Sequence, residues 1–96
     1  MTNPSAQIRH DEDRSRYELV VDGELIGVAD YHDTGGALVF PHTEIDMDRR
    51  GMGWGQVLVQ AAMDDVRTKG RIVVPQCWYV REFLDTHPEY SDLRAA

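Results

Sequence analysis

The sequence lacks the marks of several large protein classes. It has one cysteine among 96 residues, so it cannot form an internal disulfide, and we expect a reducing, cytoplasmic setting. No uncharged apolar run approaches the roughly 18 residues that cross a bilayer, and residues 1–11 lack the apolar centre of a signal peptide. These absences predict one cytoplasmic domain over residues 1–96, with no membrane-spanning segment.

Basic residues are also few. The chain has 10 Lys and Arg residues against 17 Asp and Glu residues, and its net charge is -7. This balance argues against a nucleic-acid partner, because nucleic-acid binding needs a cationic surface. With 42% hydrophobic and 28% charged residues, the composition is that of an ordinary globular protein, and we expect a monomer. An anionic ligand would have to find its positive charge locally, as Arg49 and Arg50 offer.

The alternation of apolar and polar residues predicts an antiparallel sheet. We expect strands over residues 7–10, 16–21, 24–32 and 37–45, with Asp22-Gly23 as a two-residue hairpin turn. Pro41 removes a backbone donor, so strand pairing should open or bulge there. Residues 1–6 and 94–96 are expected to be loose ends. The alternation predicts that Tyr17, Leu19 and Val21 share one side of their strand, and that Leu25, Gly27, Ala29 and Tyr31 share one face of the next.

Two helices are predicted in the second half of the chain. One runs from a glycine-rich loop to Lys69, and Gly70 is its stop. The other covers residues 76–86. Between them, residues 71–74 predict a buried strand parallel to strand 37–45, because a helix separates the two. The expected inward residues are Trp54, Val57, Leu58, Ala61, Ala62 and Val66 on the first helix, and Val80, Phe83 and Leu84 on the second.

This order of elements predicts an α+β fold. A mostly antiparallel mixed sheet, with one parallel strand pair near an end, should be covered by two main helices. The first helix has an unusual start, because no Ser, Thr, Asp or Asn stands where a capping side chain is expected. Three glycines on alternate positions and two arginines stand there instead. Glycines let an anion approach the free N–H groups of a helix start, so we interpret Arg49–Gly55 as a diphosphate site.

The residues of this loop resemble a family signature. Arg50-Gly51-Met52-Gly53-Trp54-Gly55 is similar to the Arg/Gln-x-x-Gly-x-Gly/Ala signature of GCN5-related N-acetyltransferases. Residues 40–44, 75–78 and 87–93 resemble the short, single-domain branch of that superfamily. The resemblance implies a minimal fold with the sheet splayed at its parallel pair, and acetyl-CoA as acyl donor. It implies CoA contacts at Ile45, Arg49, Arg50, Gly51, Met52, Gly53, Trp54 and Gly55.

The sequence departs from the wider superfamily at the acceptor side. Most members have two helices between their first strands, and these helices shape the acceptor site. Here about five residues separate the first two predicted strands, a truncation that the short branch shares. We therefore expect an open acceptor side, and the acceptor is an unspecified amine or protein.

Five residues are candidates for the acyl-transfer chemistry. His42 and Glu44 share one face of a strand end, and either could deprotonate an amine or be a packed or solvated side chain. Cys77 lies at the start of the second helix, where it could be a nucleophile, a proton donor or a small buried residue. Tyr79 and Tyr90 are rival proton donors, since the superfamily often uses a tyrosine on this helix.

Other site classes fit the sequence poorly. A P-loop needs Gly-Lys-Ser/Thr, and a dinucleotide fold needs Gly-x-Gly-x-x-Gly directly after a strand; neither pattern is present. The pairing of His42-x-Glu44 with Pro75-x-Cys77 resembles a zinc deaminase, but that site needs more cysteine ligands than one. We expect no metal. The sequence favours an N-acetyltransferase with direct attack of an amine on the thioester; the alternatives are a non-catalytic acyl-CoA-binding module that docks on a protein partner, and a plain interaction domain.

Overall fold

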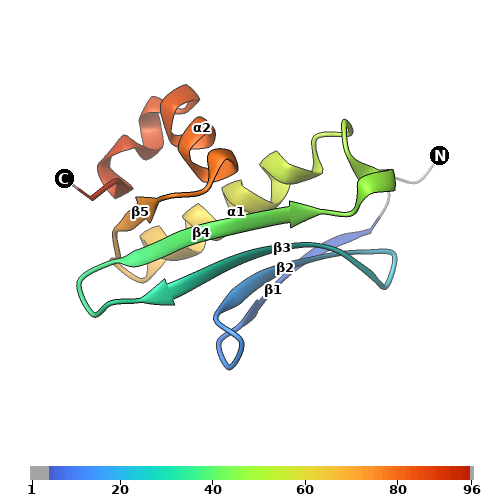
Figure 1. Cartoon of the computed structure of the whole chain (residues 1–96), viewed down its shortest axis with the longest axis horizontal. Helices are drawn as coiled ribbons and strands as arrows, with labels where there is room; N and C mark the ends of the chain where they lie inside the picture. The colour runs from blue at the N-terminus through green and yellow to red at the C-terminus, as the bar shows by residue number, and fades with distance from the viewer. Residues whose placement is uncertain (1–4, 96) are drawn as a thin grey trace.

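The computed structural model describes residues 5–95, which form a five-stranded sheet with helices packed against it (Figure 1). The strands lie in sequence order: β1 (Ala6–Asp11), β2 (Arg16–Val21), β3 (Glu24–Asp33), β4 (Leu38–Ile45) and β5 (Val73–Pro75). Four are antiparallel, and β5 is parallel to β4. The predicted α+β fold with one parallel pair is confirmed.

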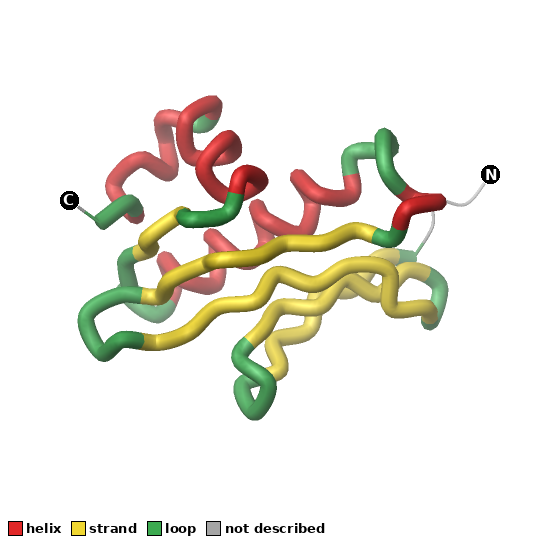
Figure 2. Tube along the Cα trace, viewed as in Figure 1, coloured by secondary structure: helices red, strands yellow, loops and turns green. Residues whose placement is uncertain are grey.

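Helix α1 (Trp54–Thr68) crosses one face of the sheet, and α2 (Trp78–Thr86) packs against α1, β4 and β5. Two short 3₁₀ helices complete the chain: η1 (Met47–Arg49) precedes the glycine loop, and η2 (Pro88–Leu93) follows α2. Figure 2 shows the loop between η1 and α1 as the link from the end of the long strand β4 to the helix layer. No helix within residues 5–95 is long and apolar enough to cross a membrane.

The β2–β3 hairpin turns as its sequence predicts. Asp22 and Gly23 have φ of 50° and 83°, and two successive positive φ values are what a type I′ hairpin turn requires. The strands beyond the turn then bulge: Leu19 pairs with Gly27 but Val20 pairs with Leu25. The extra residue, Ile26, is fully buried and Leu25 is 40% exposed. The prediction that Leu25 shares a face with Gly27 and Ala29 is therefore wrong, because the bulge breaks the alternation.

A second irregularity lies at Pro41, as predicted. Asp30 pairs with His42 and His32 pairs with Val39, so Tyr31 alone stands opposite Phe40 and Pro41. On its other edge, β4 pairs with β5 over only three residues, Leu38–Phe40. The N–H of Cys77 then donates to the Phe40 carbonyl at 2.8 Å. Beyond this point the described chain gives residues 41–45 of β4 no strand on that edge, which is the expected splay.

The inward face of α1 differs from the prediction at three residues. Val57 is 41% exposed, whereas Val59 and Met63 are fully buried. The buried stripe follows Gly55, Leu58, Val59, Ala62, Met63 and Val66, which is a helical spacing shifted by a fraction of a turn from the predicted one. The helix ends as predicted, since Gly70 has a φ of +67°. On α2, Val80, Phe83 and Leu84 are buried as expected, although this helix begins at Trp78 rather than at residue 76.

Parts of both chain ends are ordered, contrary to the expectation of loose ends. Ala6 pairs with Val21, and the N–H of Ala95 donates to the Val73 carbonyl at 2.8 Å. Arg94 forms a parallel bridge with Val73, so the C-terminal segment adds to the β5 edge of the sheet. Residues 1–4 and 96 lie outside the described part of the chain, and the expectation for them stays a prediction.

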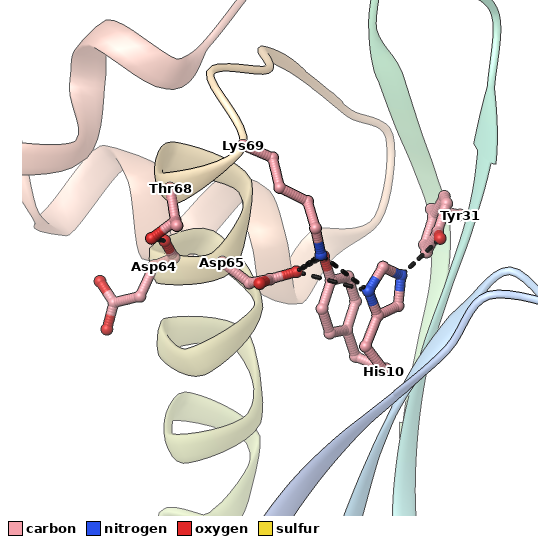
Figure 3. A network of polar contacts seen from close by, with 7 residues as sticks. His10, Tyr31, Asp64, Asp65, Thr68 and Lys69 are labelled. Carbon is pink, nitrogen blue, oxygen red and sulfur yellow. Dashed lines mark hydrogen bonds and ion pairs between the residues drawn. The ribbon is translucent and has the colours of Figure 1, made fainter.

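A polar network ties the last turn of α1 to the sheet (Figure 3). Asp65 accepts hydrogen bonds from the Tyr17 hydroxyl at 2.6 Å and from Lys69 Nζ at 2.5 Å. His10 lies beside this pair and contacts Lys69 Nζ at 3.0 Å and the Tyr31 hydroxyl at 2.6 Å. Burial and the bond to Asp65 both raise the pKa of Tyr17, so its hydroxyl stays a donor across the ordinary pH range.

Candidate functional site

The start of α1 is held open by backbone conformation. Gly51 and Gly53 have φ of 80° and 85°, a left-handed region that favours glycine, and the space where their Cβ atoms would lie is free within 4 Å. Gly53 is the N-cap residue, and within residues 5–95 no side chain caps this end. The helical ladder begins with the bond from Val57 N–H to the Gly53 carbonyl at 3.2 Å. The preceding N–H groups of the first turn therefore point out of the helix, as an anion site requires.

Two arginines flank this first turn in different states. Arg50 Nε donates to the Ile45 carbonyl at 2.9 Å, which anchors the guanidinium at the end of β4 and uses one of its five N–H donors. Arg49 Nη2 donates to the Glu24 carboxylate at 2.6 Å. Within residues 5–95, Arg50 thus has no carboxylate partner, whereas Arg49 is paired with Glu24.

A cavity of about 200 Å³ lies between the glycine loop and α2. One wall is the loop with the first turns of α1, and the other is one face of α2. The aromatic ring of Tyr79 lies over Gly55 and connects the two walls, since a Cβ on Gly55 would be 2.5 Å from Tyr79 Cε1. The lining residues are Ile45, Arg49, Arg50, Gly51, Gly53, Trp54, Gly55, Gln56, Val59, Trp78, Tyr79, Glu82, Phe83, Thr86 and His87.

Most predicted CoA contacts line this cavity. The exception is Met52, whose side chain is 66% exposed and does not line it. Of the five catalytic candidates, only Tyr79 is part of the lining. The predicted loop residues therefore line one continuous cavity, while the other four acyl-transfer candidates lie in other parts of the molecule.

His42 and Glu44 form a pair on the surface of β4. His42 Nε2 lies 3.1 Å from Glu44 Oε1, and the two side chains are 54% and 58% exposed. They alternate with Thr43 and Ile45, which are buried on the opposite face. The predicted sharing of one strand face is confirmed, and the pair lies on the segment of β4 that β5 leaves.

Cys77 is buried in the core, with a residue exposure of 7%. It is the N-cap residue of α2, and its side chain makes no capping hydrogen bond there. Arg81, one turn further along α2, donates to the Gln76 carbonyl at 3.1 Å. This environment favours a packing role for Cys77 over a role as a thiolate nucleophile.

Tyr90 lies at the far end of α1. Its hydroxyl donates to Asp64 at 2.6 Å, and its ring packs edge-on against Phe83 under the Arg67 guanidinium. The hydrogen bond to Asp64 is the main cause that raises its pKa. This placement does not support Tyr90 as a proton donor at an acyl group, because Asp64 and Arg67 lie about three to four turns from the glycine loop.

Sequence reasoning missed one wall of the cavity. The lining residues of α2 are spaced alternately one and three residues apart, which places them along one helix face. They are Trp78, Tyr79, Glu82, Phe83 and Thr86. That periodicity was the available signal, but it also describes an ordinary amphipathic helix. The missed residues are Gln56 and Val59 on α1, and Trp78, Glu82, Phe83, Thr86 and His87 at α2.

Comparison with known proteins identifies the class that this fold and loop define. The sequence profile of the GCN5-related N-acetyl-transferase family matches residues 16–93. The protein belongs to this family, and the predicted resemblance is confirmed.

Two relatives extend this result. The chain is 33% identical over 92 residues to the protein NATD1 of Xenopus tropicalis, an alignment that covers 90% of this chain and 83% of that one. Its fold is similar to the NMR structure of a GCN5-like putative N-acetyltransferase from Staphylococcus aureus, with a TM-score of 0.67 and 16% identity over 94% of this chain and 88% of that chain. At this identity the second likeness concerns the fold alone.

Proposed function

We propose that this protein is an N-acetyltransferase that takes its acyl group from acetyl-CoA and passes it to an amine. The observation that carries the proposal is the uncapped, glycine-lined first turn of α1, which opens into a cavity beside Arg50 in a chain of the GCN5-related family. The diphosphate would lie on the first-turn N–H groups, with Arg50 as the charged contact.

A second observation supports a ligand that extends from this diphosphate site along β4. The hydroxyl of Thr43 is buried and, within residues 5–95, has no hydrogen-bond partner. It lies on the stretch of β4 that pairs with β3 on one edge and that β5 leaves on the other. A buried unpaired hydroxyl is unfavourable, so a polar ligand against this strand would supply the missing partner.

The acyl transfer itself needs little from the protein. The acceptor must lose a proton, and the His42–Glu44 pair is the candidate base, with Glu44 orienting the imidazole through the 3.1 Å contact. The amine nitrogen then bonds to the acyl carbon, the carbon–sulfur bond breaks, and the departing thiolate takes up a proton. Free N–H groups on the open edge of β4 can stabilise the oxyanion of this step.

A non-catalytic acyl-CoA-binding module is the second candidate. It is favoured by one observation: His42 and Glu44 are more than half exposed and do not line the cavity. In that case the protein would bind acyl-CoA and dock on a protein partner without turning the thioester over.

One measurement separates these two candidates. Purified protein is incubated with acetyl-CoA and a panel of amines, and free CoA thiol is followed with time. Amine-dependent release, reduced in His42→Ala, supports the enzyme. Tight binding of acetyl-CoA without release by any amine supports the binding module, and the absence of binding would overturn both.

A further inference from the structure

One histidine in the cavity lining is left unexplained by the glycine loop. His87 follows the last turn of α2, directly across from the first turn of α1. Its side chain is half-buried, and its ring stacks on Phe83 with centroids 4.0 Å apart and an interplanar angle of 16°. The ring therefore has a set position in the wall of the cavity.

Hydrogen bonds also set which ring nitrogen carries the proton. Nδ1 lies 2.8 Å from the Phe83 carbonyl oxygen, and a carbonyl can only accept, so Nδ1 is the donor. In the neutral ring Nε2 is then an acceptor. Nε2 lies 3.4 Å from Nε2 of the Gln56 side-chain amide, and Gln56 belongs to the first turn of α1. Nε2 of His87 thus faces the side chain of a residue in the first turn of α1.

We propose that His87 is a second, proton-dependent contact for the diphosphate of CoA, opposite Arg50. The inference rests on the proposed CoA site. On ligand binding, Nε2 takes up a proton and donates a hydrogen bond to a phosphate oxygen, while the hydrogen bond from Nδ1 to the Phe83 carbonyl holds the ring in place. Ligand binding would in this way join the end of α2 to the start of α1, with the two walls of the cavity sharing one anion.

The charges around His87 are consistent with this role. Arg49 and Arg50 of the glycine loop and Glu82 of α2 line the same cavity, and Tyr90 of η2 packs edge-on at 6.4 Å with its hydroxyl engaged to Asp64 of α1. The Glu82 carboxylate and the C-terminal end of α2 place negative charge on this side of the cavity. They would also repel a diphosphate, and a protonated His87 between them and the ligand removes this conflict.

The test is calorimetry with dephospho-CoA, which has the diphosphate but no phosphate monoester. This choice matters because a monoester itself titrates near pH 6, whereas a diphosphate diester does not. Titrations at pH 5.5, 7 and 8.5, in buffers of different ionisation enthalpy, measure both affinity and proton uptake. We expect the wild-type protein to take up protons on binding near pH 7. We expect its affinity to fall about tenfold between pH 5.5 and 8.5, which corresponds to one charged hydrogen bond.

Two variants and one further ligand complete the design. His87→Gln should bind without proton uptake and with a flat pH profile, whereas His32→Gln, an exposed histidine of β3 outside the cavity, should behave as wild type. Pantetheine, which lacks the diphosphate, should bind wild type and His87→Gln equally. If His87 had only a structural role, the His87→Gln variant would have a lower melting temperature than wild type but the same proton uptake on binding.

The outcomes separate the two proposals. If CoA and dephospho-CoA both fail to bind the wild-type protein, the proposed function fails and the role of His87 fails with it. If they bind without proton uptake, only the role of His87 is overturned. Should His87→Gln not fold, the pKa of the His87 ring measured by NMR in the wild-type protein decides: it should rise when dephospho-CoA is added, and an unchanged value would refute the proposal.

Discussion

Tyr79 and Gly55 are in direct contact across the cavity, with the tyrosine ring lying where a side chain on residue 55 would be. This contact fixes the distance between α1 and α2, and therefore the width of the cavity. It also makes Gly55 different from its neighbours in the loop, because Gly51 and Gly53 are needed for their backbone angles and Gly55 for its missing side chain.

The first prediction compares two glycine substitutions. Gly55→Ala should lower the free energy of unfolding by about 1–3 kcal/mol through overpacking against Tyr79. Gly53→Ala should cost about 1–2 kcal/mol through backbone strain alone. Adding Tyr79→Ala should relieve the first cost and leave the second unchanged. Urea unfolding of the single and double variants measures this coupling, and equal coupling for both glycines would contradict the assigned contact.

The second prediction concerns the arginines. Arg50→Ala should weaken CoA binding by about 1.5–3 kcal/mol, the range for a charged hydrogen bond to phosphate. Arg49→Ala should have a smaller effect, because Arg49 is paired with Glu24. Arg67→Ala is the matched control, since Arg67 pairs with Asp92 away from the cavity. Calorimetric titration ranks the three, and equal affinities for Arg50→Ala and Arg67→Ala would remove Arg50 from the site.

The third prediction concerns Cys77. Because its side chain is buried, we expect direct transfer and no covalent acetyl-enzyme. Cys77→Ala should lower the rate by about 10- to 100-fold, at or below the low end of the range for a general acid or base. Intact-mass spectrometry after incubation with acetyl-CoA and no amine is the check. A stoichiometric acetyl adduct on Cys77 that an amine discharges would establish a covalent route instead.

The fourth prediction uses two tyrosine–aspartate hydrogen bonds of equal length. Tyr17→Phe removes the partly buried bond to Asp65, and Tyr90→Phe removes the exposed bond to Asp64. Tyr17→Phe should cost about 1.5–3 kcal/mol, because it removes a partly buried bond to a charged group, and Tyr90→Phe should cost about 1 kcal/mol or less.

Alkaline pH gives a further readout of the same pair. The pKa of Tyr17 in the folded protein is raised above its ordinary value of 10.0, so its contribution to stability is complete below pH 10 and is lost as the pH rises further. Wild-type stability should therefore fall above pH 10 more steeply than that of Tyr17→Phe. Thermal melting between pH 8 and 11 tests this, and parallel curves would contradict it.

The fifth prediction concerns acid pH. Arg71 donates two hydrogen bonds to Asp33 and, with the Gly35 N–H, lowers the pKa of Asp33 from 3.8 to about 2. A lowered pKa means that the stabilisation is present above pH 3.8 and is lost as the pH falls toward 2. Asp33→Asn should therefore melt below wild type at pH 6, and the difference should shrink between pH 4 and 2. A pH-independent difference would exclude ionisation of Asp33 as its cause.

The local features of this protein were predictable because each depends on neighbouring residues. Asp22-Gly23 supports a hairpin through its backbone angles, Gly70 ends α1, and the glycines before Trp54 leave a helix start without a cap. The bulge opposite Tyr31 follows from the missing donor of Pro41. Strand order and the parallel pair also follow, since a helix must connect parallel strands.

The sequence by itself therefore determined the elements, their order and the uncapped, glycine-lined start of α1. Only the tertiary structure decided which residues share the cavity, because that depends on how α2 packs across α1. The bulge that buries Ile26 and exposes Leu25 depends on strand register, which local alternation does not encode. In the same way, the approach of Tyr79 to Gly55 and of His87 to Gln56 joins residues far apart in the chain. Packing between elements brings such pairs together, and the residue spacing within one segment does not specify these contacts.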